Sequence, residues 1–514
     1  MLARRRCMAW ATAAVLAVAP IPAFAADLLR GATVVVTTNL VAGGADWAPP
    51  TMFDKAQRYD LRLRVTFNVA SRPAGPMLTL TKPNHINDWT LNGAPVMGPP
   101  KDMFFPVLDG IPTSALVVGT NVLEAKFGVN AFARDGRLSP ASTGDLKLEL
   151  QPADLSRFGI RTGPVLGAAG YDYFTVGCRT RMPATVTLHC DGRTWTSTTG
   201  VVHRLRADGL KEGQAYAYRL VADLAGGGAV ATSKVWQVST LSRKVPLAFV
   251  ALGDARGNPK IWGRIAAKAM TFHPAFAIHT GDIVGNGTDY ESWDKEFAKP
   301  AEAFLASVPC FYTFGNHENN VSMLYSLFGF TEGDNGNYSQ VIGPVQLFAM
   351  NRFEDWNKGS TNLVRLERDL AASRASFIFT FTHTPAWSSG TYGVDKLGSQ
   401  VHFPIFERYG VTAALAGHDH CYERSEPGRT TMLITGGGGA SLYGPKNAEH
   451  NPHSKIFRSE YNFLVFEATE TNCTMRAMAF GDAQTRDNER KLEEIDRRVW
   501  EARKMQTALP VPQQ

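Results

Sequence analysis

Five short motifs in this chain combine carboxylate, amide and imidazole side chains in a pattern that suits metal binding. They are Gly253-Asp254, Gly281-Asp282, Gly315-Asn316-His317-Glu318, Thr382-His383 and Gly417-His418-Asp419-His420. Aspartate oxygens, an asparagine oxygen and neutral imidazoles are ligands that divalent or trivalent first-row metals accept. A carboxylate can also bridge two ions about 3.5–4 Å apart, as in sites that cleave phosphoesters. One such histidine alone would be more typical of a hydrogen-bonded core residue, so the indication depends on the whole ordered set.

Each motif lies at the end of an apolar run that is typical of a buried strand. These runs are Leu247–Leu252, Phe276–His279, Cys310–Phe314, Phe377–Phe381 and Ala413–Ala416. Helix-like stretches such as Ile261–Met270 and Tyr290–Leu305 alternate with them, which predicts an α/β layer arrangement over residues 245–480. Ligands bind at the carboxyl ends of strands in such sheets, so we expect the motifs to meet there.

The order of these motifs resembles that of the calcineurin-like metallophosphoesterases. The run from Gly417 to Arg424, Gly-His-Asp-His-Cys-Tyr-Glu-Arg, further resembles the purple acid phosphatase branch. The resemblance covers residues 157–480 and implies a multidomain protein. Its catalytic domain would be a β-sandwich flanked by helices, with two metal ions (Fe, Zn or Mn). It implies that Asp282 bridges both ions, that Asp254 and His420 hold one, and that the other is held by Asn316, His383 and His418.

The resemblance also implies roles toward a substrate. His317 would face the substrate phosphate, and Glu318 would orient the His317 imidazole. Apart from the resemblance, Arg256, beside the first motif, could replace some phosphate contact or form a surface salt bridge. The implied reaction is hydrolysis of a small-molecule phosphate monoester by a metal-activated hydroxide. Two alternatives remain: a phosphodiesterase on the same centre, and a non-catalytic secreted protein that binds glycans or surfaces and has a degenerate metal site.

The sequence departs from the family pattern around the centre. Gly285 stands where the purple acid phosphatases carry a metal-binding tyrosine, and Arg256 stands where the wider superfamily often has a histidine ligand. One ion would therefore lack its fourth protein ligand, for which Asn258 or solvent could substitute. We accordingly expect no purple charge-transfer band. The substrate histidine of the branch is also missing, and residues 390–392, Gly-Thr-Tyr, occupy its place.

Two β-rich modules are predicted upstream of these motifs. Residues 26–152 alternate strand-like runs with turn signals such as Asn92-Gly93, which predicts a jelly-roll-like β-sandwich. In that module Trp47 and Trp89 could bind a glycan or belong to the core. Residues 157–240 resemble a fibronectin type III-like sandwich. At the other end, residues 481–514 form a charged tail, for which we expect a helix over Asp487–Thr507.

The first 25 residues have the features of a signal peptide. Arg4, Arg5 and Arg6 precede an apolar run, and Ala23-Phe24-Ala25 offers a cleavage site before Ala26. The sequence thus predicts an exported protein, periplasmic or extracellular, with no membrane span after cleavage.

Composition restricts the remaining classes of function. Among 514 residues, 44% are hydrophobic and 19% are charged, which excludes wholesale disorder and a multi-span membrane protein. The formal net charge of +6 falls to +3 without the three leader arginines, so nucleic acid is not expected as a partner. Cys178 and Cys190 could form a disulfide between neighbouring strands or remain two buried thiols.

Overall fold

The computed structural model describes most of the chain beyond the leader. The described residues are 28–29, 32–40, 59–82, 86–99, 103, 105–127, 148–318, 327–328, 336–486 and 490–503. The expected signal peptide and Trp47 therefore lie outside the described residues. Among the described helices, none is long and apolar enough to cross a membrane.

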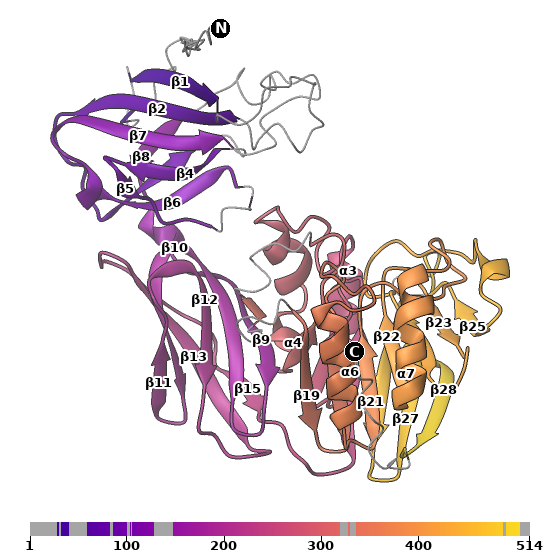
Figure 1. Cartoon of the computed structure of the whole chain (residues 1–514). Coiled ribbons are helices and arrows are strands. Elements are labelled where there is room, and N and C mark those ends of the chain that lie inside the picture. Colours follow the sequence, from indigo (N-terminus) through magenta and orange to yellow (C-terminus); the bar gives the residue numbers. More distant parts are fainter. Residues whose placement is uncertain are drawn as a thin grey trace, which may run out of the picture.

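The N-terminal module contains two antiparallel sheets (Figure 1). One has the strand order β1-β2-β7-β4-β5: Thr33–Leu40, Tyr59–Val69, Gly119–Phe127, Ile86–Leu91 and Ala94–Pro95. The other has the order β6-β3-β8: Val107–Pro112, Met77–Thr81 and Glu149–Pro152. Trp89 is buried in this module, and its indole N–H donates to the carbonyl of Ile86 at 3.0 Å. Trp89 is therefore a core residue, and it cannot stack on a sugar.

The second module is one sheet organised by a very long strand. Strand β10 pairs along its length with β9, β12, β11 and β13, and its register is interrupted between Arg179 and Ala184. The strands are β9 Ile160–Ala169, β10 Phe174–Cys190, β11 Arg193–Thr196, β12 Gly200–Ala207, β13 Ala215–Leu224, β14 Val230–Thr232 and β15 Trp236–Ser239. Met77 of the first module packs with Met182 and Leu224 of the second.

The two cysteines considered for a disulfide both lie on β10, and both are free, buried thiols. Burial raises the pKa of Cys178 to about 12 and that of Cys190 to about 11. A bridge between neighbouring strands is therefore wrong for this pair, and the alternative of two buried thiols holds.

The C-terminal module stacks two sheets face to face. The first has the order β18-β17-β16-β26-β27-β28: Cys310–Tyr312, Phe276–His279, Leu247–Leu252, Asn462–Ala468, Asn472–Ala479 and Glu493–Glu501. The second has the order β19-β20-β21-β22-β24-β23-β25: Tyr338–Ile342, Val345–Ala349, Phe377–Phe381, Ala413–Ala416, Thr431–Thr435, Tyr422–Ser425 and Ser454–Arg458. The Phe249 ring stacks on Phe466 of its own sheet and meets Phe379 of the other sheet edge-on at 5.5 Å.

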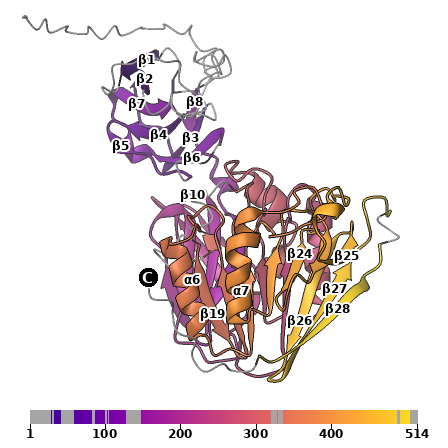
Figure 2. The ribbon, with the colours of Figure 1, turned by 45° about the vertical axis from the view of Figure 1, so that its right-hand side comes forward.

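Helices cover the outer faces of both sheets. Helix α3, Pro259–Met270, starts at an Asn258 cap and packs its apolar face, including Trp262, on the first sheet. A π-helix, Trp293–Ala298, and α4, Glu302–Leu305, follow on the same side. Helices α6, Thr361–Ala372, and α7, Phe403–Tyr409, cover the second sheet and stand side by side in Figures 1 and 2. The result is a multidomain, β-rich protein that ends in a helix-flanked β-sandwich.

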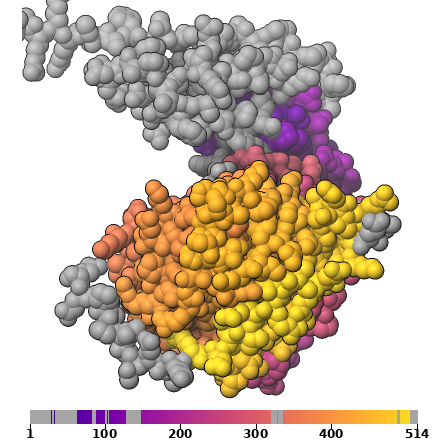
Figure 3. All heavy atoms as spheres, turned by 90° about the vertical axis from the view of Figure 1, so that its right-hand side faces the viewer, coloured from indigo at the N-terminus to yellow at the C-terminus, as the bar shows by residue number. Residues whose placement is uncertain are grey.

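The predicted helical tail is wrong. Residues Glu493–Glu501 form strand β28, which pairs antiparallel with β27 at the edge of the first sheet. Trp500 explains why tertiary packing overrides helix propensity here, because its ring is buried beside Phe466 and Phe379 and its N–H donates to Thr431. In the space-filling view of Figure 3, these yellow C-terminal strands and the orange segment that contains α7 form one continuous face.

Candidate metal centre

The predicted motifs follow strands of both sheets. Asp254, Asp282 and Asn316 come after the first-sheet strands β16, β17 and β18, whereas His383 and His418 come after β21 and β22 of the second sheet. Within each sheet these neighbouring strands are parallel. The site therefore lies where the carboxyl ends of both sets of strands converge, and each sheet supplies part of it.

Backbone turns at these strand ends are unusually tight. Asp254, Asp282 and His418 all have left-handed backbone conformations, with φ of 56°, 52° and 68°. Such conformations cost free energy in residues other than glycine, and they concentrate at functional sites. A Cβ at Gly315 would lie 2.0 Å from an oxygen of Asp282, and one at Gly417 would lie 2.2 Å from an oxygen of Asp254. These glycines thus allow close approach of the carboxylates.

The residues 436–439, all glycine, form a close-packed turn beside the first motif. The Gly438 N–H donates to the Gly253 carbonyl at 2.9 Å, and the Ala440 N–H donates to the Asp254 carbonyl at 2.9 Å. A Cβ at Gly438 would lie 2.3 Å from the Gly253 oxygen. The glycine run therefore supports the backbone of the Asp254 turn.

On one side of Asp282, three ligand-type atoms surround the Nε2 atom of His383, which makes a set of four. This nitrogen lies 3.1 Å from Oδ1 of Asn316, 3.2 Å from Nδ1 of His418 and 3.3 Å from Oδ1 of Asp282. The Nδ1 atom of His383 is 2.9 Å from the Thr280 carbonyl, to which it donates, so Nε2 is the ring atom directed at the other ligand-type atoms. Two imidazoles, one carboxylate and one amide oxygen at this spacing fit a first-row metal ion.

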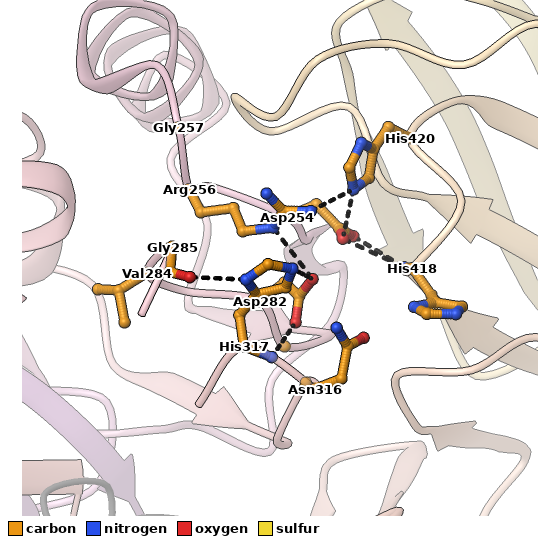
Figure 4. Close-up of polar contacts among 12 residues, drawn as sticks. Asp254, Arg256, Gly257, Asp282, Val284, Gly285, Asn316, His317, His418 and His420 are labelled. Carbon is orange, nitrogen blue, oxygen red and sulfur yellow. Dashed lines mark hydrogen bonds and ion pairs between the residues drawn. The ribbon is translucent and has the colours of Figure 1, made fainter. Parts of the chain in front are cut away.

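On the other side of Asp282, three ligand-type side chains meet a cation of the chain itself. Ligand atoms of Asp254, Asp282 and His420 lie within 4.8 Å of one another. Arg256 donates from Nε to Oδ2 of Asp282 at 3.2 Å, and its Nη2 lies 3.3 Å from Nε2 of His420 (Figure 4). Arg256 was predicted to face a substrate phosphate or the surface. Its guanidinium forms a salt bridge, but with the buried Asp282 rather than at the surface, and it also contacts His420; its side chain is 19% exposed. The contact with a phosphate stays a prediction.

The pKa shifts at the centre reflect burial and the close contact between Asp282 and the neighbouring imidazoles. Although burial raises it, the pKa of Asp282 is held well below its usual range by the His383 and His317 imidazoles. Burial lowers the pKa of His383, but the Asp282 carboxylate overcomes this effect and raises it to about 9. Burial, with the neighbouring His383, lowers the pKa of His418 to about 2. Metal ligands must be deprotonated, so a metal that bound here would displace the His383 proton.

Glu318 has a different role from the one predicted. Its buried carboxylate accepts backbone N–H groups on two turns: Oε1 accepts from Ile283 and Val284, and Oε2 accepts from Asp282 and Gly315. The His317 ring is instead oriented by the Gly285 carbonyl, which lies 2.6 Å from its Nδ1 atom. Glu318 therefore positions the backbone that carries Asp282 and Asn316, and the prediction that it orients the His317 imidazole is wrong.

His317 remains the predicted substrate-facing residue that the structure leaves open to solvent. Its side chain is 29% exposed, and its Nε2 atom lies 3.8 Å from Oδ2 of Asp282. Since Nδ1 donates to the Gly285 carbonyl, Nε2 is the atom directed toward the centre. Figure 4 shows the ring between Gly285 and Asp282.

Three further side chains at the centre escaped the sequence analysis. Arg352 follows strand β20, and its Nη1 lies 3.5 Å from Oδ1 of Asn316. Tyr392 stacks on the His418 ring at 3.9 Å, and Tyr443 stacks on the His420 ring at 4.1 Å. The available signals were the strand-like run Val345–Ala349 before Arg352 and the position of Tyr392, in the place of the missing substrate histidine.

Two other side chains, that of Asn258, which the sequence offered as a substitute ligand, and that of Cys421, are excluded as ligands. The Asn258 side chain caps helix α3 by accepting the Ile261 N–H at 3.2 Å, so it does not replace the missing fourth ligand. Cys421 is a buried free thiol whose pKa is raised well above its usual value by burial, which disfavours the thiolate that a metal would need.

The fold and the site together define a metallophosphoesterase-type domain. The family model described as calcineurin-like phosphoesterase matches residues 248–422. The chain is 23% identical over 244 residues to "Probable inactive purple acid phosphatase 1" of Arabidopsis thaliana, covering 38% of this chain and 39% of that protein. It is 27% identical over 110 residues to human "Tartrate-resistant acid phosphatase type 5", covering 21% of this chain and 34% of that protein.

A solved structure shows the same fold over more of the chain. A purple acid phosphatase from seeds of yellow lupin (Lupinus luteus) superposes with a TM-score of 0.57 and 16% identity, covering 85% of this chain and 92% of that one. Residues 248–422 thus match the calcineurin-like phosphoesterase model, and the chain is similar to purple acid phosphatases in sequence and in fold. It spans about a third to two fifths of the length of the first curated relatives it matches.

Proposed function

We propose that this protein is an exported, metal-dependent phosphoesterase that hydrolyses phosphate monoesters. The observation that carries the proposal is the convergence of six ligand-type side chains on one point from two sheets. They are Asp254, Asp282, Asn316, His383, His418 and His420. By ligand type the centre offers one metal position on each side of Asp282, and the donor set fits Fe, Zn or Mn. A bound metal ion would lower the pKa of a coordinated water and so supply hydroxide near neutral pH.

The chain itself supplies the groups that would hold the phosphoryl oxygens. His317 directs Nε2 toward Asp282, and Arg352 reaches Asn316 from the neighbouring strand end. Both can donate hydrogen bonds to an anion, and guanidinium groups bind phosphate oxygens well. In its protonated form, the His317 ring can give a proton from Nε2 to the leaving oxygen, while the Gly285 carbonyl holds its orientation.

Charge at the mouth of the site favours a monoester over a diester. A monoester dianion carries more negative charge than a diester, and the site presents two guanidinium groups, Arg256 and Arg352, near Asp282 and Asn316. The Arg352 side chain is exposed, so its guanidinium can meet an incoming phosphate directly. Tyr392 and Tyr443 add an aromatic wall for the organic part of the ester.

The direct test is hydrolysis of matched aryl phosphate monoester and diester substrates by the purified protein. We expect metal-dependent turnover that a chelator abolishes and that Mn, Zn or Fe restores, with the monoester preferred. A preference for the diester would establish the phosphodiesterase alternative. Failure of both substrates with metal-loaded protein would contradict the proposed activity. Sequencing the N-terminus of the secreted protein tests export, since cleavage should leave Ala26 first.

A further inference from the structure

The two sides of Asp282 differ in the cation that each oxygen faces. Oδ1 lies 3.3 Å from Nε2 of His383, within the complete four-atom ligand set. Oδ2 instead accepts from Nε of Arg256 at 3.2 Å. Both sequence departures from the family pattern that concern ligands, Arg256 and Gly285, fall on this second side.

The guanidinium lies among the atoms that would otherwise be metal ligands. Nη2 of Arg256 is 3.3 Å from Nε2 of His420, while Nε contacts Asp282. His420 has its Nδ1 atom 2.6 Å from the Ser441 carbonyl, to which it donates, so its Nε2 lone pair is available to accept from arginine. The same lone pair and carboxylate oxygen would bind a metal, and they cannot serve both cations at once. An arginine remains charged at any physiological pH, so its competition with a metal is permanent.

The backbone around Arg256 holds the guanidinium in this position. The Arg256 N–H donates to the Asp282 carbonyl at 3.3 Å. Glu296 accepts the N–H groups of both Gly257 and Gly285 at its Oε2 atom, at 3.3 and 2.8 Å, and so ties the loop after Arg256 to the turn after Asp282. A Cβ at Gly285 would lie 3.1 Å from the same carboxylate oxygen. The departure at Gly285 thus gives Glu296 the space from which it fixes the arginine loop.

We propose that the Arg256 guanidinium is the resident cation on the Asp254–Asp282–His420 side, so that this protein binds one metal ion, held by Asp282, Asn316, His383 and His418. The inference rests on the proposed metal centre, but it replaces one of the two metal ions by the guanidinium of Arg256. Arg256 then holds the second oxygen of Asp282 and the ring of His420 in place. One metal and one guanidinium would share the neutralisation of the phosphate.

Metal counting on the full-length mature protein tests this directly. After saturation with Mn²⁺ or Zn²⁺ and removal of free ion, we expect about one metal per chain in the wild type. The Arg256→His variant, which restores a ligand type of the wider superfamily, should bind about two. Asn316→Ala should reduce the wild-type count toward zero, whereas in the Arg256→His background it should leave about one.

A spectroscopic measurement on the wild type tests the inference without an activity assay and without depending on whether a variant folds. Electron paramagnetic resonance of the Mn²⁺-loaded wild type should show the six-line signal of an isolated ion, and a spin-coupled pair would overturn the inference. Two metals per chain in the wild type would also overturn it, yet would leave the phosphoesterase proposal intact. One metal per chain without turnover would support the inference about Arg256 and contradict the proposed phosphoesterase activity. A wild type that binds no metal would refute both.

Discussion

The two sides of the Asp282 carboxylate carry the same kinds of ligand-type side chain, but only one side also contacts a guanidinium. On one side, His383 is surrounded by Asn316, His418 and Asp282 at 3.1–3.3 Å. On the other, Asp254 and His420 share their space with the guanidinium of Arg256. Both histidines are oriented by a backbone carbonyl, that of Thr280 or Ser441. The difference teaches that ligand identity alone does not define a metal position, since one neighbouring residue changes which cation the ligands serve.

The change expected to have the largest effect is Asp282→Asn, because this carboxylate serves both sides. We expect metal content to fall and turnover of an aryl phosphate to drop by roughly 1,000-fold or more. Asp294→Asn is the control, since it also replaces a buried aspartate by asparagine. Asp294 accepts a hydrogen bond from Thr162 of the second module. Full activity in a folded Asp282→Asn protein that lacks metal would disprove the proposed mechanism.

A matched pair of histidine variants separates the two sides. His383→Ala should weaken metal binding by roughly 100-fold or more, because it removes the atom around which the complete set gathers. His420→Ala removes an equally buried ring, yet it should leave about the same metal content and lower turnover by only about 10-fold, since Arg256 still neutralises Asp282. Calorimetric metal titration of both proteins provides the comparison. Equal losses of metal affinity would show that the two sides are equivalent.

Glu318→Gln tests whether the turns that carry Asp282 and Asn316 are held by one carboxylate. In the variant an NH2 group replaces one of the two carboxylate oxygens that together accept four backbone N–H groups. We therefore expect the free energy of unfolding to fall by about 2 kcal/mol. Glu423→Gln is the matched variant, because Glu423, on β23 of the second sheet, is also buried and accepts hydrogen bonds from Ser389 and Asn451. Denaturant unfolding should show similar losses, but only the Glu318 change should also weaken metal binding.

The smallest expected effects come from the two tyrosines that stack on the ligand rings. Tyr392→Ala and Tyr443→Ala each remove the contact with a ligand histidine ring, at 3.9 and 4.1 Å, which is worth about 0.5–1.5 kcal/mol. We expect KM for an aryl phosphate to rise by roughly 2- to 10-fold with little change in metal content. The Tyr392 change should raise KM more than the Tyr443 change, because Tyr392 stacks on His418, a member of the four-atom ligand set. The reverse order would place the substrate over Arg256.

Much of the catalytic fold could be predicted because local pattern and tertiary structure agree there. The runs Leu247–Leu252, Phe276–His279, Phe377–Phe381 and Ala413–Ala416 are strands with those bounds. Such segments are buried on both faces and therefore read as continuous apolar runs. The strand Glu493–Glu501 could not be read this way, since it is charged along most of its length and is fixed at a sheet edge by Trp500.

The sequence by itself determined the ligand types and their order along the chain, and these point to a calcineurin-like phosphoesterase domain. It also placed Arg256 and Gly285 as departures from the family pattern. Only the tertiary structure decided which cation each oxygen of Asp282 faces, because the centre is assembled from strand ends of two separate sheets. The reach of the Arg256 side chain depends on Glu296, a residue of another element. Contacts of this kind have no local pattern in sequence, since they arise only when distant segments pack together.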